Sequence, residues 1–395
     1  MKSLILTLLI SLISISMLTV RAQWSTIPAV TTERLFAVHT LNSQEALIGG
    51  KDGVLFRTSN SGENWTTIAA TDEDITDILF TDENTGYMVA GSLVFKSDDG
   101  GSTWLSTPTG VGDDLVAISF PTSQTGYACT EGGDVIKSTD AGASWTALNT
   151  GSTQELTGIA FGDANTGVVV GAAGTVLHTS DGGTSWQIVD AGTTEDLNDV
   201  CFTNATTAYL VGGQGILMQT VNGGADWSNQ VSLTVSDLNA IDFYDENNGY
   251  AAGRDGVIVY TNNGGDLWNS ETPITTERLL DIHFHDANHG YAVGREGVIL
   301  QYSVATGITN SRAEKINVRI SPNPVFETAT ITIDNRKNQP WQLEVIDLSG
   351  SLVMDLEGIA RDEIRFSRDG LKSGMYIYSV KIAGHDAITG KFVVQ

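Results

Sequence analysis

The sequence predicts an all-β protein, with a seven-bladed β-propeller followed by a small C-terminal β-sandwich. Seven tryptophans, from Trp24 to Trp268, recur at intervals of 41, 39, 41, 41, 41 and 41 residues. Between them lie short apolar segments that alternate with a period of two and are bounded by Gly, Asn or Asp. A repeat of about 40 residues with strand-like segments in each unit is typical of a propeller. The repeat stops after Val304, where a second pattern of short strands begins.

Residues 1–22 are expected to form a secretory signal peptide. Lys2 supplies a basic start, an apolar run follows from Leu4 to Leu18, and small residues precede a cleavage point at Gln23. No other apolar run is long enough to span a bilayer. The mature protein is therefore expected to be exported, without a membrane span.

Residues 23–304 are expected to form the propeller, with four short antiparallel strands in each blade. The last unit, Arg278 to Val304, contains three strand patterns and no closing tryptophan. The segment QWSTIPA at Gln23 to Ala29 resembles the fourth strands NWTTIAA and SWTALNT. We expect this N-terminal strand to complete the last blade, which closes the ring and removes an open sheet edge.

An eight-residue phrase ends at six of the tryptophans, as in SDDGGSTW before Trp104. It resembles the Asp-box found in sialidases, certain glycoside hydrolases and other propellers. A tight turn needs Asx side chains that bond neighbouring backbone N–H groups, glycines for positive φ, and an indole that pins the turn to the blade. We expect a structural role for its residues, which are Asn60, Asp99, Asp140, Asp181, Asn222, Asn263, Trp65, Trp104, Trp145, Trp186, Trp227 and Trp268.

The C-terminal part divides into a polar linker at 305–316 and a sandwich of about seven strands at 317–395. Ser-Pro-Asn-Pro at 321–324, the turn at Asp347, LKSGMY from Leu371 and the closing KFVV from Lys391 resemble the type A sorting domain of the type IX secretion system of Bacteroidetes. The resemblance implies recognition of residues 317–395 by that machinery, and a secreted or outer-membrane surface location. It implies nothing about what the exported domain does.

The formal net charge of −26 argues against two classes of partner. Acidic and basic residues are balanced in the C-terminal part, so the excess acidic charge lies in the repeats. Such a domain repels nucleic acid and anionic membrane surfaces. The two cysteines, Cys129 and Cys201, belong to nonadjacent blades and are expected to be buried free thiols.

We expect no catalytic residue, cofactor or metal. Glycosidic hydrolysis normally needs two flanking carboxylates, and no such pair stands out from acids that recur in every blade. His283 and His285 would point the same way on a strand, and His39 holds the place of His283 in blade one, so a metal site is conceivable. The equivalent position varies freely elsewhere, which favours incidental histidines. No phosphate loop, CxxC pair or nucleophile elbow is present.

One sector departs from the repeat. Blades two to six begin with acidic loops, whereas blades seven and one both begin with TTERL. The turn between the second and third strands carries a cation in blades six, seven and one. Adjacent acids could simply pair with these cations; alternatively, the cations receive an acidic partner. Five of the eight Lys and Arg residues at 23–304 lie here: Arg34, Lys51, Arg254, Arg278 and Arg295.

The repeats, with LxxIxF, GYxVG, GRxG turns and the DGGxxW phrase, resemble the seven-bladed photosystem II assembly-factor family. In that family an arginine-rich patch is associated with binding a membrane-protein client, and the matching GRxG turns are those of Arg254 and Arg295. The leading hypothesis is a non-catalytic propeller that binds a protein, peptide or glycan through one face. An extracellular glycoside hydrolase or sialidase-like propeller and an envelope assembly factor are the alternatives.

Overall fold

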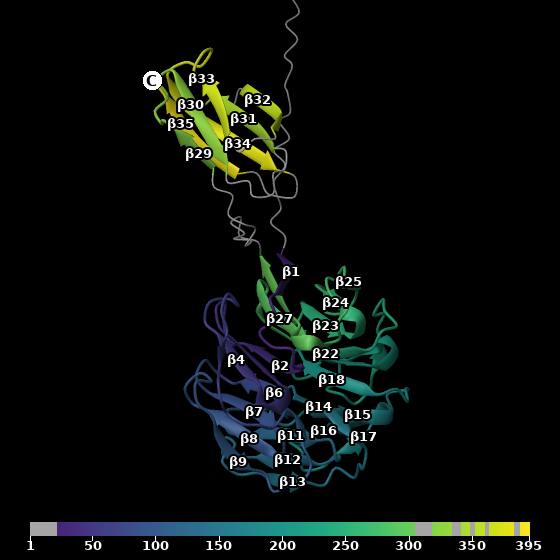
Figure 1. Cartoon of the computed structure of the whole chain (residues 1–395). Coiled ribbons are helices and arrows are strands. Elements are labelled where there is room, and N and C mark those ends of the chain that lie inside the picture. Colours follow the sequence, from purple (N-terminus) through teal and green to yellow (C-terminus); the bar gives the residue numbers. More distant parts are fainter. Residues whose placement is uncertain (1–21, 305–317, 334–340, 348–351, 360–362, 383–387) are drawn as a thin grey trace, which may run out of the picture. The chain divides into compact units, whose positions relative to one another are not determined.

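The computed structural model describes residues 22–304, 318–333, 341–347, 352–359, 363–382 and 388–395. Residues 1–21 of the expected signal peptide and the whole expected linker lie outside this part. The chain divides into two compact units between Thr306 and Gly307 (Figure 1). Among the described residues, no helix is both long enough and apolar enough to cross a membrane.

The first unit is a β-propeller. Residues 22–304 form seven four-stranded antiparallel sheets, which are the blades. The first strand of each blade contacts the first strand of the next, and that of the seventh blade contacts that of the first, so the blades form a ring. Figure 1 shows β2, β6, β14, β18 and β22 around the centre, with β9, β13, β17 and β25 at the rim.

Six blades run in chain order from the inner to the outer strand. Blades one to three are β2 (Leu35–Thr40), β3 (Ala46–Gly50), β4 (Leu55–Thr58), β5 (Thr66–Thr67); β6 (Ile75–Phe80), β7 (Gly86–Ala90), β8 (Leu93–Ser97), β9 (Leu105–Pro108); and β10 (Leu115–Ser119), β11 (Gly126–Thr130), β12 (Val135–Ser138), β13 (Thr146–Leu148). Blades four to six are β14 (Leu156–Phe161), β15 (Gly167–Gly171), β16 (Val176–Thr179), β17 (Gln187–Ile188); β18 (Leu197–Phe202), β19 (Ala208–Gly212), β20 (Leu217–Thr220), β21 (Ser228–Asn229); and β22 (Leu238–Phe243), β23 (Gly249–Gly253), β24 (Ile258–Thr261), β25 (Trp268–Ser270).

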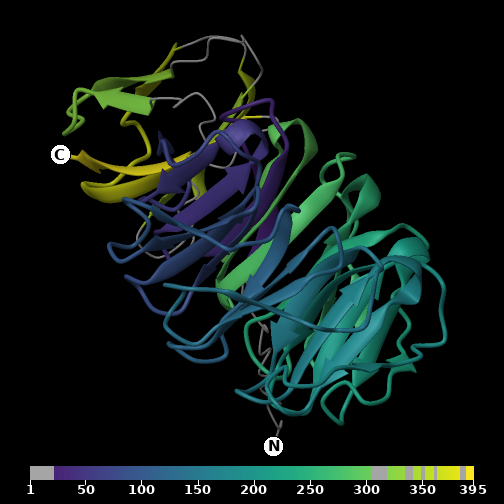
Figure 2. The ribbon, with the colours of Figure 1, turned by 90° about the horizontal axis from the view of Figure 1, so that it is seen from below.

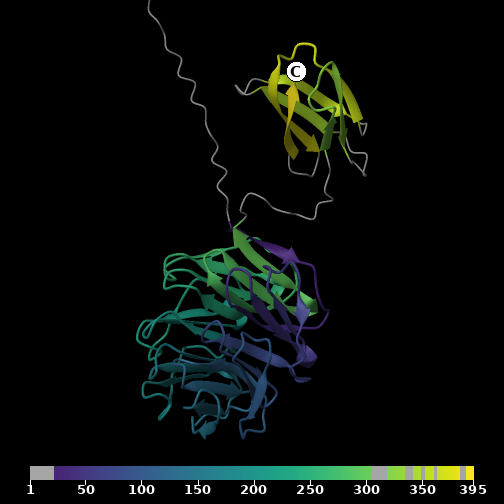
Figure 3. The ribbon, with the colours of Figure 1, turned by 90° about the vertical axis from the view of Figure 1, so that its left-hand side faces the viewer.

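The seventh blade joins the two ends of the propeller sequence. It contains β26 (Leu279–Asp286), β27 (His289–Gly294), β28 (Ile299–Val304) and, as its outer strand, β1 (Ala22–Ile27). β1 and β28 are antiparallel, from Ala22 opposite Val304 to Ile27 opposite Ile299. Figures 2 and 3 show the purple start of the propeller beside its green end. The N-terminal strand therefore takes the position that the sequence predicted.

Neighbouring blades are joined by a repeated aromatic contact. The ring of Tyr87 in blade two stacks on Phe120 of blade three at 3.7 Å between centroids, and Trp145 meets Phe120 edge-on at 6.0 Å. The Tyr87 hydroxyl also donates to the carbonyl of Ala141, in the turn before Trp145. Tyr127 with Phe161 and Tyr209 with Phe243 repeat the stack in later blades. We call this Tyr–Phe–Trp arrangement the aromatic clamp.

Trp24 completes the clamp in the seventh blade, where no phrase tryptophan is present. Its indole meets Phe284 edge-on at 5.6 Å and Tyr250 at 6.2 Å. Phe284 in turn stacks on Tyr250 of blade six at 4.1 Å. Trp24 is 8% exposed. The closing strand therefore contributes packing as well as hydrogen bonds.

On one face of the propeller, turns of five blades pack closely against the backbone of the next blade. Short 3₁₀ turns connect the second and third strands in five blades, and a Cβ on their last glycine would come within about 2 Å of a threonine carbonyl in the following blade. Gly256, for example, would meet Thr275 O at 2.1 Å and has φ +68°. Only glycine fits such a close approach. The turns are η1 (Lys51–Gly53), η2 (Ala172–Gly174), η3 (Gly213–Gly215), η4 (Arg254–Gly256) and η5 (Arg295–Gly297).

The loop that contains this threonine leads into the first strand of each blade, and we call it the incoming loop. Each of these five turns thus lies on the incoming loop of the next blade, and both belong to the same face. We call the part of this face that contains Arg34, Lys51, Arg254, Arg278 and Arg295 the cationic sector. There, η4 contacts the incoming loop of blade seven and η5 contacts that of blade one, through Thr275 and Thr31.

The second unit is a sandwich of one three-stranded and one four-stranded antiparallel sheet. Its core includes Trp341, Phe366 and Phe392. The strands are β29 (Val318–Ser321), β30 (Thr328–Ile333), β31 (Trp341–Asp347), β32 (Leu352–Ile359), β33 (Glu363–Ser367), β34 (Gly374–Ile382) and β35 (Ile388–Val394).

Replacing Trp24→Ala should destabilise the propeller. The change removes a buried indole from the seventh blade, so we expect a loss of about 3 kcal/mol in the free energy of unfolding, within the usual range for such truncations. Ser25→Ala, on the exposed side of the same strand, is the control and should cost less than about 0.5 kcal/mol. Urea unfolding followed by circular dichroism measures both. Equal effects of the two variants would contradict a stabilising role for the closing strand's indole.

Candidate functional site

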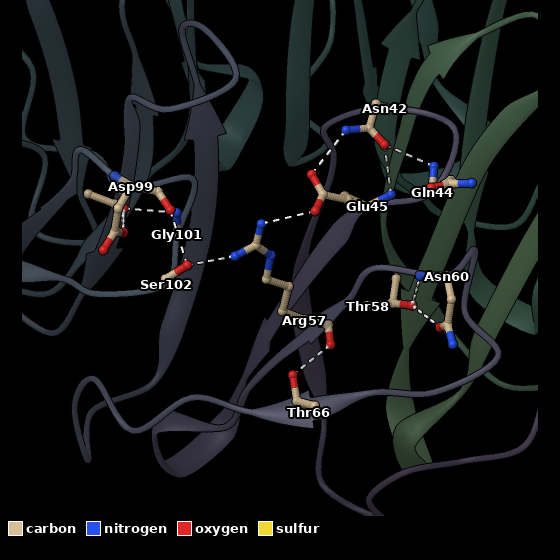
Figure 4. Close-up of polar contacts among 11 residues, drawn as sticks. Asn42, Gln44, Glu45, Arg57, Thr58, Asn60, Thr66, Asp99, Gly101 and Ser102 are labelled. Atoms are coloured by element: carbon tan, nitrogen blue, oxygen red, sulfur yellow. Dashed lines mark hydrogen bonds and ion pairs between the residues drawn. The ribbon is translucent and has the colours of Figure 1, made fainter.

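The repeated phrase builds the turn between the third and fourth strands. Asp99 accepts hydrogen bonds from the Thr103 backbone N–H at 2.8 Å, the Thr103 hydroxyl at 2.7 Å and the Ser97 hydroxyl at 2.8 Å. These bonds lower the pKa of Asp99 to about 2. Asp140 is held in the same way. Figure 4 shows the corresponding contact of Thr58 with Asn60 in blade one. Carboxylates engaged by their own turn are poor candidates for acid–base chemistry.

Four carboxylates line the central channel, a cavity of about 410 Å³, and they belong to Asp77, Asp199, Asp242 and Asp281. Each accepts a backbone N–H from the next blade, and all except Asp242 lie beside a β-bulge in the first strand of their blade; we call these three the channel carboxyls. Asp77 accepts from Ile118 at 2.8 Å and Asp199 from Ile241 at 2.9 Å. Asp281 accepts from Val38 at 2.7 Å. A bulge leaves a backbone N–H without a partner in its own ladder, and these carboxylates supply one.

Burial raises the pKa of the channel carboxyls. It raises the pKa of Asp77 to about 6 and that of Asp199 to about 7, while the hydrogen bonds to Ile118 and Ile241 oppose the shift. The pKa of Asp281 is raised by burial and then by the charge of Asp77. The bonds tie adjacent blades, so we assign these groups to the scaffold.

Two of the three histidines considered for a metal site, His39 and His283, pack against each other. The rings of His39 and His283 lie 4.0 Å apart. The Thr40 backbone N–H donates to Nδ1 of His283 at 3.1 Å. Burial lowers the pKa of both imidazoles. The described residues contain no group of three His, Cys, Asp or Glu side chains arranged to hold a metal ion.

Both cysteines are free thiols in the described part of the chain. Cys129 is buried, as expected, whereas Cys201 is only half-buried because it faces the channel. Burial raises the pKa of each thiol, which disfavours the reactive thiolate.

One position of the incoming loop distinguishes the cationic sector from the other blades. This position is Asp74 in blade two, Asp196 in blade five and Asp237 in blade six. Each carboxylate accepts a hydrogen bond from the backbone N–H of the second residue in the 3₁₀ turn of the preceding blade, at 2.7, 2.9 and 3.2 Å respectively. In blades seven and one the position holds Arg278 and Arg34. The corresponding backbone N–H groups, of Asp255 and Glu296, have no acceptor among the described residues.

Three arginines converge on one pocket of about 320 Å³. Arg254, Arg278 and Arg295 line it together with Asp255, Thr276 and Glu277. Arg278 donates to Oδ1 of Asn239 from Nε at 3.2 Å and from Nη2 at 2.6 Å, which fixes its guanidinium between blades six and seven. Burial lowers the pKa of Arg278, Asp237 raises it, and Arg295 and Arg254 lower it further. The guanidiniums are therefore close enough to repel one another.

The acids adjacent in sequence do not neutralise these arginines. Arg254 and Arg278 share a single carboxylate, that of Asp237, at 3.8 and 3.7 Å. Among the residues that the structure describes, Arg295 and Arg34 lie within 4 Å of no carboxylate. Of the five, Lys51 alone pairs with its neighbour, Asp52 at 3.3 Å, and with Glu33 at 3.7 Å.

Cations elsewhere in the propeller have closer partners. Arg57 binds Glu45 at 3.1 Å and the Ser102 hydroxyl at 2.7 Å (Figure 4). Lys96 pairs with Asp98 at 3.1 Å, and Lys137 donates to a backbone carbonyl at 2.7 Å. In the described propeller, the cationic sector is thus where arginines lie 3.7 Å or more from a carboxylate, or have none within 4 Å.

Sequence reasoning missed the partners that position Arg278. Asp237 lies one repeat of 41 residues before Arg278, so comparison of equivalent positions could have identified it. Comparison of equivalent positions would not have identified Asn239 as a partner of Arg278. The equivalent polar residues Thr157 and Asn198 donate to a backbone carbonyl of the next blade, so a polar residue here already has a structural role. The channel carboxylates were also missed, although Asp77, Asp199 and Asp281 share one repeat position.

Two family models match the chain. The model of the secretion system C-terminal sorting domain matches residues 319–395. The second unit is a type IX sorting domain. Such a domain marks the chain for export. The model of the photosynthesis system II assembly factor YCF48 matches residues 184–272, from the phrase of blade four to the incoming loop of blade seven.

Solved structures show the propeller fold. YCF48 bound to D1 peptide is 18% identical and gives a TM-score of 0.60, over 71% of this chain and 96% of that one. The WD40 propeller domain of Doa1 is 8% identical, with a TM-score of 0.61 over 73% and 99% of the chains. The GH74 enzyme of Niastella koreensis is 12% identical, with a TM-score of 0.59 over 79% and 60%. No curated protein matches the sequence.

Because the pKa values of the channel carboxyls are raised, we expect the free energy of unfolding to increase as the pH falls from 8 to 5. The folded state of Asp199 keeps its proton up to about pH 7, whereas the unfolded carboxyl loses it near pH 4. The contribution of this group is therefore complete below pH 4 and is lost as the pH rises through about 7. Asp199→Asn should flatten the dependence of the melting temperature on pH over this range.

Lower pH also relieves repulsion among the many surface acids, so a charge-matched control is needed. Asp72→Asn removes one negative charge from an exposed loop and should leave the slope unchanged. Thermal melts of the three proteins from pH 5 to pH 8 make the comparison. An unchanged slope in the Asp199 variant would contradict the assignment.

Proposed function

We propose that this protein is an exported, non-catalytic propeller whose cationic sector binds a carboxylate-bearing partner. The observation that carries the proposal is the exchange of an acid for an arginine at the incoming-loop position of blades seven and one. In blades two, five and six the acid's carboxylate accepts a turn amide. In blades seven and one the amides of Asp255 and Glu296 lack that acceptor, and an arginine holds the acid's position.

A carboxylate of the partner would accept hydrogen bonds from the free turn N–H and from a guanidinium at the same time. The N–H of Asp255 and the guanidiniums around the pocket are donors, and charge-assisted hydrogen bonds are roughly twice as strong as neutral ones. The preorganised guanidinium of Arg278 would lose little side-chain freedom on binding, because Asn239 already holds it. The turn of Glu296 with Arg34 offers a second position of the same kind in the neighbouring blade.

The comparisons support a binding role at the level of the fold. YCF48 has been solved with a peptide bound, and its family model matches blades five and six of this chain. Export by the sorting domain suits a partner at the cell surface or in the medium, including another exported envelope protein. A glycoside hydrolase is the weaker candidate, since the likeness to the GH74 enzyme lies at 12% identity and supports only a shared fold.

Charge reversal in the cationic sector tests the proposal. The probes are two fluorescent twelve-residue peptides, one of alternating Glu and Ser and one of alternating Gln and Ser, with a uronate oligosaccharide as a third probe. We expect the full chain to bind at least one acidic probe and to ignore the Gln peptide. Arg295→Glu and Arg254→Glu should each weaken that binding at least tenfold, since losing one charge-assisted bond corresponds to about 1.5–3 kcal/mol.

Lys96→Glu is the matched control, because it makes the same change in net charge on a cation outside the sector. Fluorescence anisotropy measures the peptides, and competition measures the oligosaccharide. Equal losses in Lys96→Glu and Arg295→Glu, or no binding of either acidic probe, would overturn the proposal. Release of reducing sugar from the oligosaccharide by the purified chain would favour the hydrolase instead.

A further inference from the structure

Exposed apolar side chains gather in the same sector as the unneutralised arginines. In the described propeller, nine large apolar side chains are exposed, and five of them lie in the incoming loops of blades six, seven and one. The incoming loops of blades two to five contribute none of the nine. The five residues are Val30, Val231, Leu233, Val235 and Ile274.

The incoming loop of blade six is the most apolar of these. Val231, Leu233 and Val235 are 73, 59 and 86% exposed, although they lie within five residues of one another. Alternate residues of a segment ending at Ser236 therefore present three apolar side chains to solvent. We call Val231–Val235 the apolar loop.

Leu233 has a backbone conformation that its own domain does not explain. Its φ of +60° is in the left-handed region, and the equivalent positions in the preceding three repeats are Gly110, Gly151 and Gly192, with φ of +83, +74 and +74°. A Cβ at any of those glycines would meet no atom within 4 Å. A side chain at this position projects into open space, so packing within the propeller does not compensate the strain. Strain held at such a place is a signal of function.

The apolar loop adjoins the pocket lined by Arg254, Arg278 and Arg295, which we call the arginine pocket. Ser236, directly after the loop, lies 3.3 Å from Asp255 through its hydroxyl, and Asp255 lines the pocket. Asp237 follows and pairs with Arg254 and Arg278. η4 separates the loop from the incoming loop of blade seven, which contributes Ile274 as well as Arg278. Apolar and cationic groups therefore follow one another on consecutive loops of one face, which we call the strip.

We propose that the partner is a polypeptide segment in which apolar side chains stand next to carboxylates. The apolar side chains would cover the apolar loop, and the carboxylates would enter the arginine pocket and meet the N–H of Asp255. This rests on the proposed function and narrows it. An acidic glycan would satisfy the arginines and the amide, but it offers little to three exposed aliphatic side chains, which gain from burial against apolar groups.

Matched peptides test the proposal against the full chain. The probes are three fluorescent ten-residue peptides: one with Leu, Val and Phe in the first half and four Glu in the second, one with Ser in place of the apolar residues, and one with Gln in place of Glu. We expect the first to bind at least tenfold more tightly than either of the others, since burying one aliphatic side chain corresponds to roughly that factor.

Variants of the apolar loop identify where the apolar half binds. The double change Val231→Ser with Val235→Ser should remove the advantage of the first peptide over the Ser peptide. Leu233→Gly should weaken the first peptide several-fold while leaving the melting temperature equal or higher, because glycine relieves the left-handed strain. Val221→Ser is the control, since Val221 is 69% exposed but lies in a phrase turn outside the strip.

The outcomes separate this inference from the proposed function. If the Ser peptide binds as tightly as the first, or the loop variants change nothing while Arg254→Glu still abolishes binding, the inference fails and the proposed function stands. If no peptide binds but the uronate oligosaccharide does, the partner is a glycan and the inference again fails. If neither Arg254→Glu nor the loop variants alter binding, both fail. Conversion of a dimer to a monomer by the serine variants would assign the loop to self-association and overturn the inference.

Discussion

The structure depends on the aromatic clamp between consecutive blades. A tyrosine from one blade stacks on a phenylalanine of the next, a tryptophan meets that phenylalanine edge-on, and the tyrosine hydroxyl bonds the turn before the tryptophan, as with Tyr87, Phe120 and Trp145. Each aromatic pair adds about 0.5–1.5 kcal/mol to what its buried area contributes. The stacked pair joins blades two and three, three and four, five and six, and six and seven. It holds these blades at the same spacing, so their incoming loops occupy equivalent places on one face.

That regularity explains how a few substitutions can create a site. At equivalent places, Asp237 and Arg278 face the turns of the preceding blades. The acid completes the scaffold, whereas the arginine leaves a turn N–H without a protein acceptor and adds a positive charge. No new loop or insertion is needed. The apolar loop follows the same logic, since Leu233 replaces a glycine without changing the path of the backbone. Both features alter the surface while leaving the clamp untouched.

Much of the fold could be predicted because the repeat exposes it. The likeness of Gln23–Ala29 to the fourth strands of other blades identified the closing strand, and the strand pattern after Val304 indicated the sandwich. The partners of the arginines were harder, because adjacent residues such as Glu277 looked like the natural counterions. In the structure, alternate residues of an incoming loop point to different neighbours, and Arg278 reaches back to Asp237 and Asn239 of the previous blade. The residues next to Arg278 in the sequence do not show that its side chain points toward the previous blade, although the spacing of 41 residues between Asp237 and Arg278 is consistent with it. The exposed state of Val231 and Val235 could not be predicted, since a short apolar run is equally compatible with a buried strand.

The pairing of β1 with β28 has a consequence for how the domain assembles. Six blades consist of strands that are near neighbours in the sequence, so each can form soon after its own residues are available. The seventh must wait until the two ends of the propeller sequence meet across the whole ring. Until then β28 has an unpaired edge, which is a site for association with other chains. We therefore expect ring closure to come late in folding, after the six sequence-local blades have formed.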